Sequence, residues 1–229
     1  MKTIIAAVAI LAATLSLAFS LSAEDARPLA QREQRLGVVK CANLVYANNK
    51  SSVCFSDQFL AQAAKDTNTK TTGKFTAIRA DEVELYEYPF AVMTGEGAFV
   101  LTAAQRDNLK NYLTRGGFLL ASAGCSSPEW AASFNREIKT IFPTLEMKKL
   151  EMSHELFRTV YEIKELTAKR NSTPHLSGLE IDGKIVVVFT EDGLNDTANA
   201  GPNCCCCGGN EIRNAKLINV NLLAYALTH

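Results

Sequence analysis

The sequence lacks an excess of charge of either sign. Its 229 residues include 24 basic and 24 acidic residues, which gives a formal net charge of zero, and neither sign forms a long run. A protein that binds nucleic acid or an anionic membrane by electrostatic attraction needs a basic patch or stripe. The composition carries no such signal, and we expect no nucleic-acid partner.

Long hydrophobic runs are absent beyond the N-terminus. A positive start, Met1 to Thr3, precedes an apolar stretch over residues 4–19, and small residues then lead to Glu24. This layout is typical of a secretory signal peptide, and it predicts cleavage near Ser22 or Ala23. We therefore expect residues 1–22 to be a signal peptide and the mature protein to be periplasmic or extracellular, without a transmembrane domain. The alternative is an uncleaved anchor, because about 18 apolar residues are the least that span a bilayer.

The rest of the chain has the size and composition of one domain. Residues 23–36 are polar and charged, and we interpret them as a linker to a single domain over residues 37–229. A chain that is 47% hydrophobic and 21% charged can bury one sizeable core. From Val38 onward, short apolar runs alternate with stretches of helical period. This alternation predicts an α/β protein with a doubly wound, mostly parallel sheet.

Local signals place several elements within this domain. Thr102 and Gln105 form a capping box, and Ser127 followed by Pro128 marks the start of another helix. Asp182 and Gly183 are a hairpin turn signal. Strands are predicted over residues 38–45, 75–78, 89–93, 118–121 and 185–189, and a largely buried helix over residues 216–227.

Several stretches of the domain resemble one known family. They read YPFAVMTGEGAF, LKNYLTRGGFLLA and SFNREIKTIFP between Tyr88 and Pro143, followed by SHELF, GLEIDGKIVVVF and INVNLLAYAL in the same order. The chain is similar in these segments to the domain of unknown function 4159 family. The resemblance implies a fold like that of class I glutamine amidotransferases, which is a flavodoxin-like three-layer α/β/α sandwich. It brings no assigned reaction and no cofactor.

The sequence departs from the family pattern at two places. Gly95, Glu96 and Gly97 stand where relatives usually have Gly-His-Gly, and Ser122 and Ala123 stand where they usually carry two acidic residues. If those polar residues perform the family's chemistry, this chain has lost it. Gly95, Glu96 and Gly97 follow a predicted strand, so they are candidates to line a ligand pocket at the carboxyl end of the sheet, with an ordinary turn as the alternative.

Cys125 is the candidate nucleophile. It lies where a buried strand passes into a helix, and the N-terminus of a helix can lower the pKa of a thiol. The required base would be His154, because His175 and His229 read as loop and terminus. However, the tight Gly-x-Cys-x-Gly turn of true amidotransferases is absent. A disulfide or a plain buried thiol is the simpler interpretation of Cys125 in an exported protein.

The other cysteines suggest disulfides or a metal. Cys41 and Cys54 flank a polar loop that a disulfide could close, with two core thiols as the alternative. Cys204 and Cys207 begin and end a run of four cysteines and have C-x-x-C spacing. They could form disulfides, one of them with Cys125, or bind a soft metal ion with further ligands. Seven cysteines in total leave at least one without a disulfide partner in the chain.

These observations favour an exported domain without catalysis. We expect it to bind a small ligand, or another exported or membrane protein, at the carboxyl ends of its strands. One alternative is a cysteine-dependent hydrolase or amidotransferase-like enzyme that uses Cys125 and His154. Another is a metal or redox role for Cys204–Cys207. No cofactor is indicated.

Overall fold

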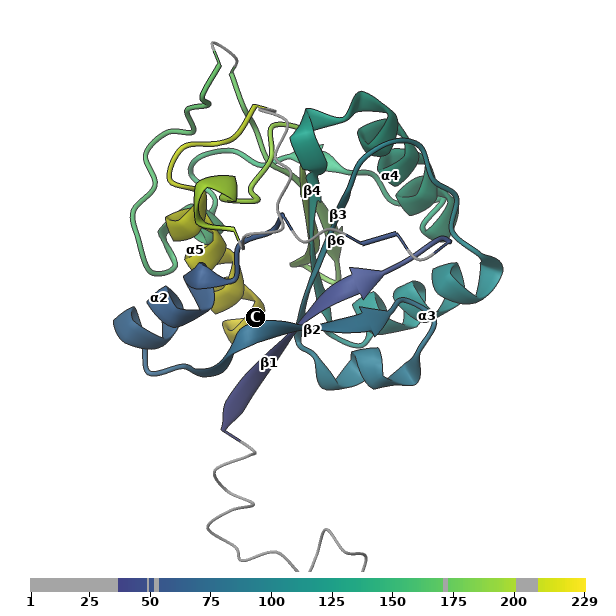
Figure 1. Cartoon of the computed structure of the whole chain (residues 1–229), viewed down its shortest axis with the longest axis horizontal. Coiled ribbons are helices and arrows are strands. Elements are labelled where there is room, and N and C mark those ends of the chain that lie inside the picture. The colour runs from purple at the N-terminus through teal and green to yellow at the C-terminus, as the bar shows by residue number, and fades with distance from the viewer. Residues whose placement is uncertain (1–36, 49, 52–53, 171–172, 201–209) are drawn as a thin grey trace, which may run out of the picture. The chain divides into compact units, whose positions relative to one another are not determined.

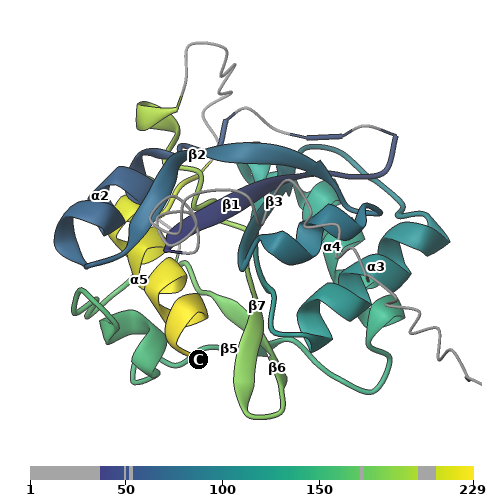
Figure 2. The ribbon, with the colours of Figure 1, turned by 90° about the horizontal axis from the view of Figure 1, so that it is seen from below.

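A single mixed sheet organises the part of the chain that the computed structural model describes, namely residues 37–48, 50–51, 54–170, 173–200 and 210–229. Seven described strands follow the order β2-β1-β3-β4-β7-β6-β5 (Figures 1 and 2). The first five strands in this order are parallel, and β6 and β5 extend the sheet through antiparallel pairings that begin at β7. The expected α/β class and the mostly parallel sheet are therefore confirmed.

The strand bounds follow the apolar runs of the sequence. The strands are β1 (Val38–Val45), β2 (Lys70–Arg79), β3 (Phe90–Gly95), β4 (Phe118–Ala123), β5 (Lys148–Lys149), β6 (Ser177–Ile181) and β7 (Lys184–Thr190). All residues of the central strands β3 and β4 are buried, which is typical of parallel strands covered on both faces. Strand β2 is longer than the predicted 75–78, because its ladder with β1 begins at Lys70 and continues past an irregularity that contains Gly73.

Helices cover both faces of this sheet. The described helices are α2 (Gln58–Asp66), α3 (Ala103–Thr114), α4 (Pro128–Ile141) and α5 (Ala215–Thr228), with short 3-10 turns η1 (Val83–Glu87), η2 (Gly124–Ser126), η3 (Glu155–Arg158) and η4 (Thr197–Asn199). Figures 1 and 2 place α2 and α5 on one face and α3 and α4 on the other. The predicted caps are present: Thr102 and Gln105 form both bonds of the capping box, and Ser127 accepts from Trp130 N–H.

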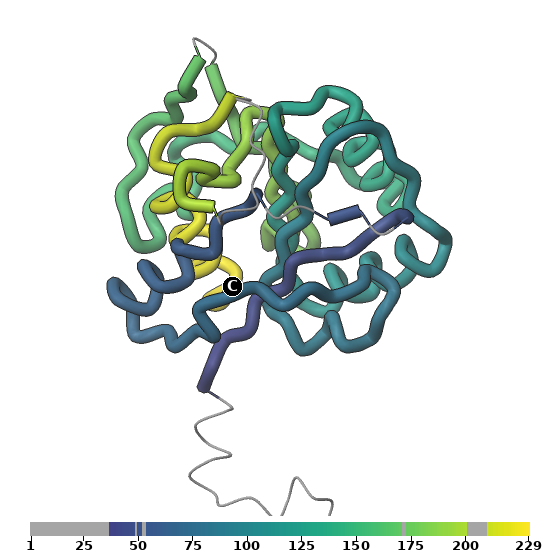
Figure 3. Tube along the Cα trace, in the orientation of Figure 1, coloured from purple at the N-terminus to yellow at the C-terminus, as the bar shows by residue number. Residues whose placement is uncertain are grey.

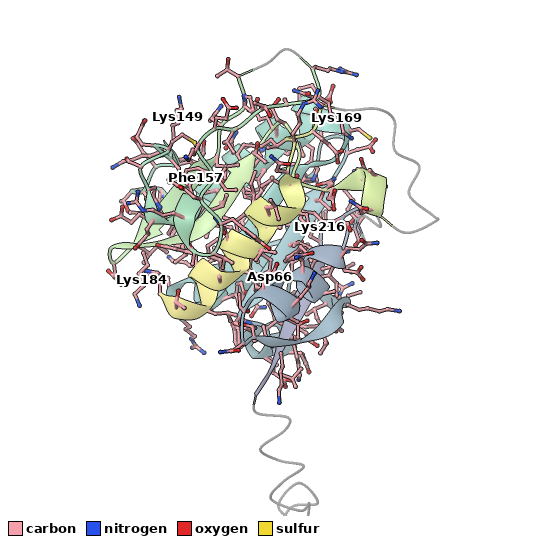
Figure 4. The ribbon with its side chains drawn as sticks, turned by 90° about the vertical axis from the view of Figure 1, so that its left-hand side faces the viewer. Asp66, Lys149, Phe157, Lys169, Lys184 and Lys216 are labelled. Atoms are coloured by element: carbon pink, nitrogen blue, oxygen red, sulfur yellow. The ribbon has the colours of Figure 1, made fainter. Side chains whose placement is uncertain are left out.

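Two apolar clusters fill the space between the helices and the sheet. One joins Trp130 and Phe134 of α4 to the sheet, and the other joins Phe59 of α2 and Leu222 of α5 to the opposite face. Helices α2 and α5 pack side by side although they are the first and last of the described chain (Figure 3). Figure 4 looks onto this face, with α5 running across it near Phe157.

The connections change face at two points in the sheet. The chain leaves β1 for α2 on one face and leaves the neighbouring β3 for α3 on the opposite face. The same change occurs between β4, which leads to α4, and β7, which leads to α5. Such switch points form crevices at the carboxyl ends of parallel strands, and ligands of open α/β sheets bind there. We therefore expect a ligand site at this edge of the sheet.

Residues Gly37–His229 form one compact unit. Within the described residues, none of the helices has both the length and the apolar character that crossing a membrane requires.

Candidate functional site

The turn after β3 lies at the first switch point. An ideal Cβ on Gly95 would lie 2.3 Å from the Tyr46 hydroxyl oxygen and 3.0 Å from Trp130 Nε1, so this position has no room for a side chain. Gly97 has a φ of +67°, and its N–H donates to Ser127 Oγ over 3.0 Å. Packing and backbone conformation thus explain both glycines of the predicted pocket, and Glu96 between them is exposed.

Tyr46 packs against the end of β3 at Gly95. Its hydroxyl donates to the Thr94 carbonyl over 3.0 Å and accepts from Trp130 Nε1 over 2.5 Å. Burial raises the pKa of Tyr46 to about 12, so the hydroxyl stays protonated and can donate at any physiological pH. The Tyr46 ring meets the Phe99 ring edge-on at 4.9 Å. These contacts hold the ends of β1 and β3 together in a fixed geometry.

A cavity opens at the switch point between β1 and β3. It has a volume of about 350 Å³ and is lined by the segment after β1, the segment after β3 and one side chain of α4. The lining residues are Ala47, Asn48, Lys50, Ala98, Phe99, Val100 and Arg136. The cavity therefore lies next to the predicted ligand pocket. On this segment its lining begins at Ala98, one residue after Gly97, and it includes two cations, Lys50 and Arg136, that the sequence analysis did not single out.

Cys125 occupies a strained turn at the second switch point. The residue lies in η2, directly between β4 and α4, with φ +48° and ψ +25°, and Ser126 follows with φ +55°. Such left-handed backbone in residues other than glycine costs on the order of 1 kcal/mol or more each, and it persists only where surrounding contacts enforce it. One such contact is the bond that Ser126 Oγ donates to the Asn210 carbonyl over 2.8 Å. The thiol is partly exposed.

His154 lies at the opposite end of the sheet from Cys125. Its ring is 5.9 Å from the ring of Tyr225, and the Tyr225 hydroxyl accepts from Ile185 N–H at the start of β7. Cys125 follows the carboxyl end of β4, which pairs with the far end of β7. Ile185 and Thr190 mark these two ends of β7, and the five residue steps between them span about 17 Å. The structure therefore does not bring the predicted nucleophile and base together, because parallel strands send their two ends to opposite edges.

The remaining histidines do not change this arrangement. His229 stacks on Tyr225 at 4.3 Å and so lies at the same end of the sheet as His154. His175 precedes β6 and is exposed. A second cavity, of about 560 Å³, surrounds His154 and includes Lys148, Glu151 and Glu180 in its lining. It lies beside the antiparallel extension of the sheet.

A buried polar cluster joins the carboxyl ends of β3, β4 and β7. Thr94 and Asn195 exchange hydrogen bonds, with 3.2 Å from Asn195 Nδ2 to Thr94 Oγ1. Ser122 Oγ accepts from Leu194 N–H over 2.7 Å. Asn210 Nδ2 donates to Asp192 over 2.7 Å. Sequence reasoning singled out Ser122 only as a departure from the family pattern and missed the other residues, because their partners are 72 to 101 positions away or lie in loops without a motif.

The structure contradicts one sequence-based prediction, the disulfide between Cys41 and Cys54. Cys41 is a fully buried thiol that packs in the same cluster as Phe59 and Phe90, and burial raises its pKa to about 12. Cys54 is disulfide-bonded. A disulfide between Cys41 and Cys54 is therefore wrong for this structure, because the Cys41 side chain points into the core on its strand. The alternative of a core thiol holds for Cys41.

The predicted metal or disulfide residues Cys204 and Cys207 lie outside the described residues. Among the residues that the structure does describe, no group of three or more histidine, cysteine, aspartate or glutamate side chains is arranged to hold a metal ion.

Comparison with known proteins gives a family and no activity. No curated protein matches the sequence. A family model, described as domain of unknown function (DUF4159), matches residues 40–227, which include nearly the whole described chain. The match agrees with the segments that resemble this family in sequence. The chain therefore belongs to the family of the domain of unknown function DUF4159.

Proposed function

We propose that this protein is a ligand-binding domain without catalytic activity, and that a small molecule binds in the crevice between the carboxyl ends of β1 and β3. The observation that carries this proposal is the position of the cavity of about 350 Å³ at a point where the connections change face. Its volume lies at the lower end of the range for small-molecule sites. Ligands of open α/β sheets bind in such crevices.

The separation of Cys125 from His154 supports a function without catalysis. A nucleophile and its base need to lie within about 3 Å of each other, or to reach that distance when substrate binds. These two residues lie at opposite ends of the strands, a separation far greater than that reach. The hydrogen bond from Ser126 Oγ to the Asn210 carbonyl gives the turn at Cys125 a structural role.

The finer description of the fold is part of this proposal. We propose that the domain is a flavodoxin-like three-layer sandwich with a fold like that of the class I glutamine amidotransferases. The strand order β2-β1-β3-β4-β7 and the helices on both faces support it.

We further propose that the protein is exported and acts in the periplasm or outside the cell. The positive, apolar and small-residue order of residues 1–23 supports export. The intact mass of the protein recovered from cells tests this, because cleavage near Ser22 or Ala23 removes a defined mass. An unchanged full-length mass would contradict cleavage.

Ligand binding can be tested by screening small molecules against the isotope-labelled protein by NMR. We expect hits to shift the amide signals of Ala98 and Val100. Ala98→Trp would obstruct the cavity, and Ala77→Trp is the matched control, because Ala77 is also exposed but lies on β2. Hits should be lost in Ala98→Trp and kept in Ala77→Trp. Hits that persist equally in both variants would contradict the proposed site.

A further inference from the structure

The cavity between β1 and β3 is lined by two cationic side chains, Lys50 and Arg136, and by an exposed apolar patch at Val100. We propose that its ligand is an organic anion in which a carboxylate or phosphate group is attached to an apolar body. This inference rests on the proposed function and specifies the chemical class of the ligand.

The two cations are held in place by the same loop. Lys50 Nζ donates to the Glu96 carbonyl over 3.0 Å, and Arg136 Nη2 donates to the Phe99 carbonyl over 2.7 Å. An ammonium has three donors and a guanidinium has five, so each side chain keeps donors for a ligand. Because both are already anchored to the segment after β3, ligand binding would cost little additional side-chain entropy.

The positive charge at the cavity is incompletely balanced. Lys50 meets a carbonyl of Glu96 and not a carboxylate. The carboxylate nearest to Arg136 belongs to Glu137, at 4.0 Å, and that carboxylate also accepts from Arg106 over 2.7 Å. One buried carboxylate is thus shared by two arginines. The cavity therefore has a net positive lining, which attracts an anion.

Apart from the two cations and Asn48, the lining consists of apolar residues. Val100 is 62% exposed, and it is one of three large hydrophobic residues of the described chain that are exposed. Ala98 beside it is also exposed. Phe99 between them is buried and packs on Tyr46 and on Trp130, with the rings 5.6 Å apart in the second pair. A ligand with an apolar body would cover Val100, and a purely inorganic anion would leave it exposed.

The proposal separates ligands by charge and by apolar content. The probes are hexanoate and hexyl phosphate as amphiphilic anions, acetate and inorganic phosphate as small anions, and hexanol and hexylammonium as apolar controls without negative charge. Each is titrated into the purified protein, and the amide signals of Ala47, Ala98 and Val100 report binding. We expect hexanoate or hexyl phosphate to bind most tightly, and the better of the two identifies the anionic group.

Variants of the two cations test the contribution of charge. Lys50→Met and Arg136→Met remove a charge and keep most of the apolar stem. Each should weaken binding of the best anion about tenfold, since a hydrogen bond to a charged group contributes that much. Arg136→Lys keeps the charge and should restore part of the affinity. Lys149→Met, at the other cavity, is the matched control and should bind as the unmodified protein does.

The outcomes distinguish this inference from the proposed function. Binding of hexanol or hexylammonium as tight as that of hexanoate would overturn the anion proposal and leave a ligand site between β1 and β3. Equal binding of acetate and hexanoate would overturn the apolar part of the proposal. If no probe of any charge shifts these signals and the screen also yields no hit there, both proposals fail.

Discussion

The substitution Gly95→Ala tests the packing at the end of β3. A methyl group at this position would lie 2.3 Å from the Tyr46 hydroxyl oxygen, well inside van der Waals contact. The Tyr46 ring cannot withdraw easily, because its hydroxyl bonds to the Thr94 carbonyl and to Trp130 Nε1 inside the core. Either the strands separate or the hydroxyl moves and gives up both bonds.

The expected cost follows from these two contributions. Overpacking a filled core costs about 1–3 kcal/mol, and each displaced hydrogen bond about 1 kcal/mol. We therefore expect Gly95→Ala to lower the free energy of unfolding by about 3 kcal/mol, the lower end of the sum of these contributions. With a urea dependence of about 2 kcal/mol per molar, the unfolding midpoint would fall by about 1.5 M.

A double-mutant cycle identifies the cause. Tyr46→Phe removes the oxygen that the new methyl group would meet, so Gly95→Ala should cost much less when it is combined with Tyr46→Phe. We expect a coupling free energy of about 2 kcal/mol between the two substitutions, measured by urea unfolding. If Gly95→Ala costs the same with and without Tyr46→Phe, the contact with Tyr46 is not the reason for the glycine.

Two further predictions concern buried ionisable groups. Burial raises the pKa of the Cys41 thiol from 9.0 to about 12, so its contribution to stability is present in full below about pH 9 and is lost as the pH rises toward 12. The substitution Cys41→Ala should therefore flatten the fall of the urea midpoint between about pH 9 and 11. An unchanged slope would assign that fall to other groups. Arg106→Met should destabilise the protein by about 2 kcal/mol, because it weakens the pairing of the Glu137 carboxylate, whose side chain is 3% exposed. The control is Arg136→Met, which removes a cation 4.0 Å from the same carboxylate. It should cost less than about 1 kcal/mol, because Arg136 is half exposed. Equal urea midpoints for the two variants would contradict the assigned pairing.

Local sequence signals predicted most of the elements of this fold. The capping box at Thr102, the Ser127-Pro128 start of α4 and the Asp182-Gly183 turn each depend on residues within a few positions of one another. Such signals act through short-range hydrogen bonds and backbone preferences, which the sequence contains in full. The two-residue strand β5 was missed, because two lysines have neither the length nor the apolar pattern of a strand.

The sequence by itself determined the class of fold, the order of its elements and the residues that cap and turn them, because these follow from local chemistry and hydrophobic period. Only the tertiary structure decided which residues meet. It placed His154 and Cys125 at opposite ends of the strands, put Cys41 in the core, and brought Lys50 and Arg136 to one cavity. Those outcomes depend on strand order and on the face that each helix covers, and neither is written in any short stretch of the chain.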